Sequence, residues 1–168
     1  MSLSHLDAEG RARMVDVGGK PVSERSATAA GQVRMARGAF EAVAAGKNAK
    51  GDVLTVAEVA GVMAAKRTGE LIPLCHPLGL DLARVECALD ANLPGVRVTA
   101  TCRTTGRTGV EMEALTAVTV ACLTVYDMVK AADRTMRIEA IRLLAKSGGT
   151  GGDWRADDAD AVTPSKEL

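Results

Sequence analysis

An acid and a base, Asp127 and Lys130, stand three residues apart in a segment with helical character. Residues three apart on a helix project from the same face, so the carboxylate and the ammonium group lie close enough to change each other's pKa. On a solvated helix such a pair is ordinarily only a surface ion pair. Here residues 114–125, immediately before the pair, are apolar on most sides. The pattern therefore predicts a buried helix that ends in a cleft, with acid–base groups in the cleft wall.

Glu113 precedes Asp127 by fourteen residues on the same predicted helix. With a rise of about 1.5 Å per residue, the two carboxylates fall on roughly the same side of the helix but about 20 Å apart. A single small ligand does not easily touch both groups within one subunit. Two explanations stay open: Glu113 is only a first-turn acid favoured by the helix dipole, or the pocket is shared between subunits.

His76 lies in a segment that Pro73 and Pro77 make stiff and non-helical. A histidine ring held by such a loop can bind phosphate or transfer a proton. The neighbouring Cys75 raises a second hypothesis, a zinc site. Tetrahedral zinc needs more ligands than this pair, and the other histidine, His5, is far away in the sequence. The sequence therefore predicts no metal site, and a zinc or redox role would require stoichiometric metal in the purified protein.

A local anion site can be built from basic residues spread along the chain, namely Arg25, Lys50, Lys66, Arg67 and Lys146. Each of them alone is most often a solvated surface charge. Lys and Arg total 21, and Asp and Glu also total 21, so no overall basic field exists that would attract nucleic acid or a membrane surface. Residues 146–149 do not form a Walker loop, because the glycines follow the lysine and no helix pattern comes after them.

The composition suits one α+β domain. Of the 168 residues 47% are hydrophobic and only 2% are aromatic, so the core must consist of aliphatic side chains. We expect the domain to span residues 1–154 and the tail, residues 155–168, to be disordered because it has little to bury. The four cysteines form no C-x-x-C pair and are expected to be reduced. No signal peptide is evident, and no apolar run reaches the ~20 residues that span a bilayer, so we expect a cytoplasmic protein.

Hydrophobic periodicity and turn residues predict the elements that position these side chains. Strands are expected at residues 14–17, 22–29, 83–89, 96–102 and 136–143, the last with a bulge near Ala140, and helices at residues 31–45, 55–67 and 108–132. The turn at residues 92–95 joins two of the strands as an antiparallel hairpin. This order predicts an α+β fold of ferredoxin-like type, an antiparallel sheet covered on one face by helices.

Several motifs of the chain resemble the cyclic pyranopterin monophosphate synthase family, the MoaC accessory proteins of molybdenum cofactor biosynthesis. The matched segments follow the family's order along nearly the whole chain: residues 3–5, 14–17, 50–53, 64–68, LIPLCHPL at 71–78, TGVEMEALT at 108–116, YDMVK at 126–130 and RLLAKSGG at 142–149. So many consecutive blocks make chance similarity very improbable. No family motif is present at the hairpin turn near Asn92 or after Trp154.

The resemblance implies a lyase that converts 3′,8-cyclo-7,8-dihydro-GTP into cyclic pyranopterin monophosphate and releases pyrophosphate. It implies a homohexamer built as a trimer of dimers, with an active site at the dimer interface. Such a site would explain how Glu113 and Asp127 can serve one ligand although they lie about 20 Å apart within one subunit. The site residues carried over from the family are Asp127, Lys130 and Lys50 as catalytic groups, Leu74, Cys75, His76, Met112 and Glu113 as substrate contacts, and Arg25, Lys66 and Lys146 as phosphate or pocket partners. No cofactor is implied, and magnesium bound with the triphosphate stays open.

The implied rearrangement opens one ring, forms another and closes a cyclic phosphate, so it needs proton donors and acceptors with pKa values near neutrality. Crowding can lower the pKa of lysines toward that range. Our hypothesis assigns Lys50 as the general acid and Asp127 with Lys130 as the general base, with lysines and His76 stabilising the leaving pyrophosphate. The alternative is a non-catalytic nucleotide-binding or assembly subunit, because ferredoxin-like folds serve many functions.

Overall fold

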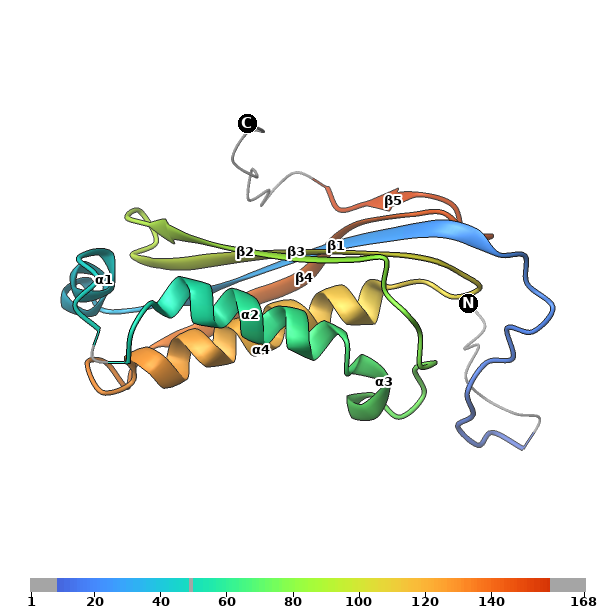
Figure 1. Ribbon diagram of the computed structural model, residues 1–168, viewed down its shortest axis with the longest axis horizontal. Coiled ribbons are helices and arrows are strands. Elements are labelled where there is room, and N and C mark those ends of the chain that lie inside the picture. The colour runs from blue at the N-terminus through green and yellow to red at the C-terminus, as the bar shows by residue number, and fades with distance from the viewer. Residues whose placement is uncertain (1–8, 49, 158–168) are drawn as a thin grey trace.

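The structure, a computed structural model, describes residues 9–48 and 50–157. Its elements are β1 (Ser23–Arg34), α1 (Arg37–Ala44), α2 (Val53–Ala65), α3 (Thr68–Leu71), β2 (Leu82–Asp90), β3 (Gly95–Gly106), α4 (Glu111–Val129), β4 (Arg137–Ser147) and β5 (Trp154–Arg155). The strands form one antiparallel sheet in the order β2-β3-β1-β4-β5, and Figure 1 shows α2 and α4 on one face of it. The predicted fold class, a ferredoxin-like antiparallel sheet covered on one face by helices, is confirmed.

The central helix is α4, which packs against α2 and against the strands β1 and β3. Ten of its residues are buried, most of them Ala, Val or Cys, so the core is built from small aliphatic side chains as the composition predicts. By length and composition alone this helix could cross a membrane. Its burial against the sheet and α2 identifies it instead as the core helix of the domain.

The predicted helix at residues 31–45 is wrong in its first part, because β1 continues to Arg34 and only residues 37–44 are helical. The reason is tertiary packing. Gly31 lies in a central strand beneath α4, where an added Cβ would stand 2.8 Å from Val118 Cγ1. The glycine therefore lets the helix approach the strand closely, a role that helix propensity along the chain does not reveal.

The helix α2 begins at Val53, two residues before the predicted start at residue 55. Its N-cap is Asp52, whose carboxylate accepts hydrogen bonds from the backbone N–H groups of Leu54 at 3.0 Å and Thr55 at 3.2 Å. Glu58 of α2 accepts a hydrogen bond from the backbone N–H of Cys87 at 2.8 Å, which ties the helix to β2. A carboxylate at the N-cap satisfies backbone N–H groups of the first turn that have no partner within the helix.

Two other predicted boundaries also move. The helix α4 begins at Glu111 without a side-chain cap, whereas the sequence pattern predicts a start at Thr108. Residues 14–17 do not form the predicted strand. They lead instead into a turn, which is closed by a hydrogen bond from the backbone N–H of Lys20 to the carbonyl of Val17 at 3.0 Å.

The bulge predicted near Ala140 is confirmed. Ala140 has a positive φ of 55°, and the pairing of β4 with β1 shifts register between Ala30 and Gln32. After β4 the chain returns as β5, which pairs with Ala145 and Lys146, so ordered structure includes the first residue of the predicted tail. Residues 158–168 of that tail lie outside the described residues.

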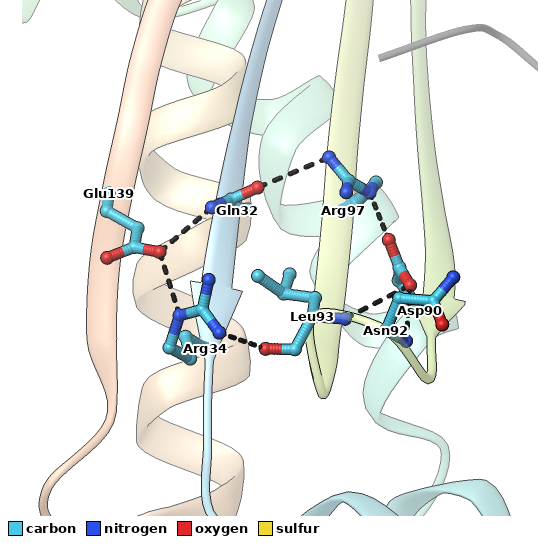
Figure 2. Close-up of polar contacts among 7 residues, drawn as sticks. All are labelled: Gln32, Arg34, Asp90, Asn92, Leu93, Arg97 and Glu139. Atoms are coloured by element: carbon cyan, nitrogen blue, oxygen red, sulfur yellow. Dashed lines mark hydrogen bonds and ion pairs between the residues drawn. The ribbon is translucent and has the colours of Figure 1, made fainter. Parts of the chain in front are cut away.

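A row of polar side chains crosses the face of the sheet that α2 and α4 leave open, as Figure 2 shows. Glu139 of β4 accepts hydrogen bonds from Gln32 Nε2 at 2.9 Å and from Arg34 Nε at 3.1 Å. Arg97 of β3 donates to Gln32 Oε1 at 3.3 Å and pairs with Asp90 at the end of β2. The row links the four long strands and supports their register. The register in turn decides which strand ends meet at each end of the sheet.

Candidate active site

Three charged side chains meet at the C-terminal end of α4. Lys130 Nζ donates to Asp127 Oδ1 at 2.6 Å, and Lys50 Nζ donates to Asp127 Oδ2 at 2.9 Å. Lys50 Nζ also donates to the backbone carbonyl of Asp127 at 2.9 Å, a position where the unpaired carbonyls of a helix end favour a cation. All three side chains are about half exposed. The structure thus brings together the three residues for which the sequence predicts catalysis.

The charge state of this cluster follows from its hydrogen bonds. Hydrogen bonds from Lys130 and Lys50 lower the pKa of Asp127 from 3.8 to about 2. The carboxylate is therefore ionised throughout the neutral range and is a weak proton acceptor there. Because the folded-state pKa is depressed, any stability that these pairs contribute is present above pH 3.8 and is lost as the pH falls toward 2.

A cavity of about 690 Å³ lies at the other end of α4. The first turn of α4, the loop after α3, the segment before β1 and the ends of β1 and β4 contribute to its wall. Seven of the residues predicted to contact substrate or phosphate line it: Arg25, Leu74, Cys75, His76, Met112, Glu113 and Lys146. The eighth, Lys66, follows the last turn of α2 and does not line the cavity.

Sequence reasoning missed three charged residues of this cavity. Lys20 and Arg107 add two cations to its lining, and Glu111 accepts a hydrogen bond from Lys146 Nζ at 3.1 Å. Arg107 directly precedes the family motif at residues 108–116, and this position next to the motif could have indicated that it belongs to the site. Lys20 reaches the cavity only because the turn before β1 folds against it, and no local pattern indicates that contact.

Glu113 is buried in the cavity wall, with 4% of its surface exposed. Burial raises its pKa above the ordinary value of 4.5, its own backbone hydrogen bond opposes that rise, and the charge of Glu111 adds to it. A carboxyl group with a raised pKa retains its proton to higher pH. Glu113 is thus suited to donate a hydrogen bond or a proton to a ligand in the cavity.

Glu113→Gln is expected to stabilise the protein at pH 7 to 8 and to leave its stability near pH 4 almost unchanged. With a raised folded-state pKa, the native state loses stability as the pH rises above 4.5, the ordinary value. A neutral glutamine avoids that loss, so Tm should rise by about 2–4 °C, equivalent to about 1 kcal/mol for a chain of this size. Thermal unfolding between pH 4 and 8 measures the effect, with the exposed Glu41→Gln as the control. A Tm difference that stays constant across this range would contradict the assignment.

The two groups of predicted residues are separated by the length of α4. Glu113 lies in the first turn of this 19-residue helix and Asp127 in its last turn, about 20 Å away along the axis. Figure 1 shows the end of α4 beside α1 at one end of the molecule and the start of α4 at the end where α3 lies. Within one subunit, the Lys50–Asp127–Lys130 cluster therefore does not line the cavity.

The cysteines provide no reactive thiolate. Burial raises the pKa of Cys87, Cys102 and Cys122 to about 12 each, so these thiols act as small apolar side chains. Burial, aided by the charge of Glu113, also raises the pKa of Cys75 in the cavity wall, which disfavours nucleophilic chemistry there. In the described part of the chain, no group of three His, Cys, Asp or Glu side chains is placed to hold a metal ion.

Known proteins are similar to this sequence over almost its full length. The cyclic pyranopterin monophosphate synthase of Methylobacterium sp. (strain 4-46) is 62% identical over 158 residues, which cover 94% of this chain and 99% of the relative. The synthase of the same name from Methylobacterium nodulans is 60% identical with the same coverage. That of Brucella ovis is 57% identical over 156 residues, 93% of this chain and 94% of the relative. The match to the MoaC family spans residues 14–149, which include the charged cluster and most of the cavity lining, and this chain therefore belongs to the MoaC family.

Proposed function

We propose that this chain is a cyclic pyranopterin monophosphate synthase, a lyase of molybdenum cofactor biosynthesis. The observation that carries the proposal is 57–62% identity to synthases of that name across nearly the whole of both chains. The substrate is a GTP-derived intermediate, 3′,8-cyclo-7,8-dihydro-GTP. The products are cyclic pyranopterin monophosphate and pyrophosphate.

The chemistry of the cavity supports binding of such a substrate. Its lining carries the cationic groups of Lys20, Arg25, Arg107 and Lys146, and arginine and lysine are the usual donors to phosphate oxygens. We assign these cations to the triphosphate and to the charge that grows on pyrophosphate as it leaves. The ring system is assigned to the apolar and polar groups around His76, namely Leu74, Cys75, Met112 and Glu113.

We further propose that two subunits share each active site. The support is the separation of about 20 Å between the Asp127 end of α4 and the cavity at its start, because one small substrate does not span it. In a two-fold dimer each subunit presents the same surface to its partner. Two antiparallel α4 helices across the dyad would place the Lys50–Asp127–Lys130 cluster of each subunit against the cavity of the other. The proposed assembly is a homohexamer, a trimer of such dimers.

Within this shared site the two lysines of the cluster carry the proton transfers. We assign Lys50 as the general acid and Lys130, held by Asp127, as the general base. The low pKa of Asp127, about 2, supports a carboxylate that orients the two amines and stays ionised while they exchange protons. Closure of the partner's cavity over the cluster would exclude water and strengthen the electrostatic interactions of the two amines with a bound substrate.

The direct test incubates the purified protein with 3′,8-cyclo-7,8-dihydro-GTP, follows pyrophosphate release, and identifies the product by its mass. We expect one pyrophosphate for each cyclic pyranopterin monophosphate formed. A folded hexamer that forms no product would defeat the proposal. A non-catalytic binder would instead retain the substrate unchanged, and its Asp127→Asn variant would show only reduced affinity.

We also propose that the enzyme works in the cytoplasm. All four cysteines are free, which is typical of reducing compartments. Cell fractionation with an antibody to the protein tests this location, and recovery in a membrane or exported fraction would contradict it.

A further inference from the structure

Arg25 is the most deeply buried cation of the cavity, with 8% of its surface exposed. Its Nε donates to the backbone carbonyl of Gly106 at 3.0 Å. Its Nη2 is buried and donates to no acceptor among the described residues. A buried charged donor without an acceptor is costly, so an anionic ligand of the cavity that reached this nitrogen would remove that cost.

The guanidinium of Arg25 rests against the backbone of Gly149, in the turn that follows β4. Gly148 and Gly149 have φ angles of +84° and +77°, in the left-handed region that glycine occupies without steric cost. A Cβ at Gly149 would overlap Arg25 Nη1 and would stand 2.7 Å from Arg25 Cζ. A Cβ at Gly148 would overlap the backbone carbonyl of Glu24. A side chain at position 149 would therefore displace the guanidinium itself.

We propose that Gly149 is a positioning residue for anion binding and that it acts through Arg25. The bond to Gly106 and the contact with Gly149 hold the guanidinium on two sides, and Nη2 remains for the ligand. A donor held in this way loses little conformational freedom when the ligand binds, and the planar guanidinium suits paired phosphate oxygens. The inference rests on the proposed function, because it takes the anion to be the pyrophosphate end of the substrate.

The test compares Gly149→Ala with Gly152→Ala in the full-length protein. Gly152 also has a positive φ, +65°, but a Cβ there would meet no atom within 4 Å. Both substitutions therefore impose backbone strain, and only the one at Gly149 displaces Arg25. Binding of inorganic pyrophosphate is measured by calorimetry for the wild type, for both variants, for Arg25→Ala and for the double variant Arg25→Ala with Gly149→Ala. Thermal unfolding of each protein is recorded in parallel.

We expect Gly149→Ala to weaken pyrophosphate binding by about tenfold or more and Gly152→Ala to change it by less than about twofold. In the Arg25→Ala background, Gly149→Ala should cause no further loss of affinity, because two residues that act through one contact are not additive. If Gly149→Ala does not fold, the same coupling predicts that removal of the Arg25 side chain restores folding in the double variant.

Two results would overturn the inference alone: Gly149→Ala that binds pyrophosphate as the wild type does, or an equal loss with and without Arg25, in affinity or in folding. A wild-type protein that binds no pyrophosphate would overturn the inference together with the proposed anion site. The wild-type titration therefore separates a failure of the proposed function from a failure of the role given to Gly149.

Discussion

Lys130→Ala is expected to lower kcat by roughly two to four orders of magnitude, the range typical for loss of a general acid or base, while the protein stays folded. The amine of Lys130 lies 2.6 Å from Asp127 Oδ1, and our proposal makes this amine the base of the rearrangement. Its ion pair is half exposed, and exposed pairs contribute little to stability. Steady-state turnover of 3′,8-cyclo-7,8-dihydro-GTP measures the loss of kcat. The oligomeric state and Tm of the variant show whether the protein is still folded.

Lys50→Ala provides the companion measurement. We expect a comparable loss of kcat, with a slightly larger decrease in Tm because Lys50 also donates to the backbone carbonyl of Asp127 at the end of α4. The matched control is Lys47→Ala, an exposed lysine in the same loop, which should leave kcat within about twofold of the wild type. Near-normal turnover by Lys130→Ala with substrate bound would exclude the role given to the cluster.

Mixed assembly of two inactive variants is expected to restore activity. One variant, Asp127→Asn, loses the anion that orients the two lysines, and the other, His76→Ala, loses a side chain of the cavity. If two subunits share each site, a mixed dimer contains one site with neither substitution and one site with both. Random mixing puts half of the dimers in the mixed form, so about a quarter of all sites should be intact.

The experiment unfolds and refolds an equimolar mixture of the two variants and compares its turnover with each variant refolded alone. We expect recovery approaching about a quarter of wild-type activity, because about one site in four carries neither substitution. The control is a mixture of the Lys50→Ala variant with the Asp127→Asn variant. Both substitutions fall in the same cluster, so every site in this mixture contains a damaged cluster and no intact site forms. Equal activity in the two mixtures would contradict a site shared between subunits.

Periodicity within single segments was a reliable guide to most of the elements. The hairpin of β2 and β3 and the central helix α4 appear as predicted, because alternating and helical apolar patterns reflect burial of one face of each element. The prediction was wrong at Gly31, where the strand β1 continues under α4. A glycine that is required for close packing between two elements has a low propensity for both helix and strand, so the sequence alone does not reveal its role.

For the site, the sequence by itself determined the pair Asp127 and Lys130, because a spacing of three places both on one helix face. It also determined that Glu113 lies too far along that helix to share a ligand with them within one subunit. The family resemblance already named Lys50, but the tertiary structure alone decided that Lys50 contacts Asp127 and that Lys20 reaches the cavity. Those contacts join residues distant in the sequence, and they depend on the antiparallel register and the packing of loops against strand ends, which no local spacing encodes.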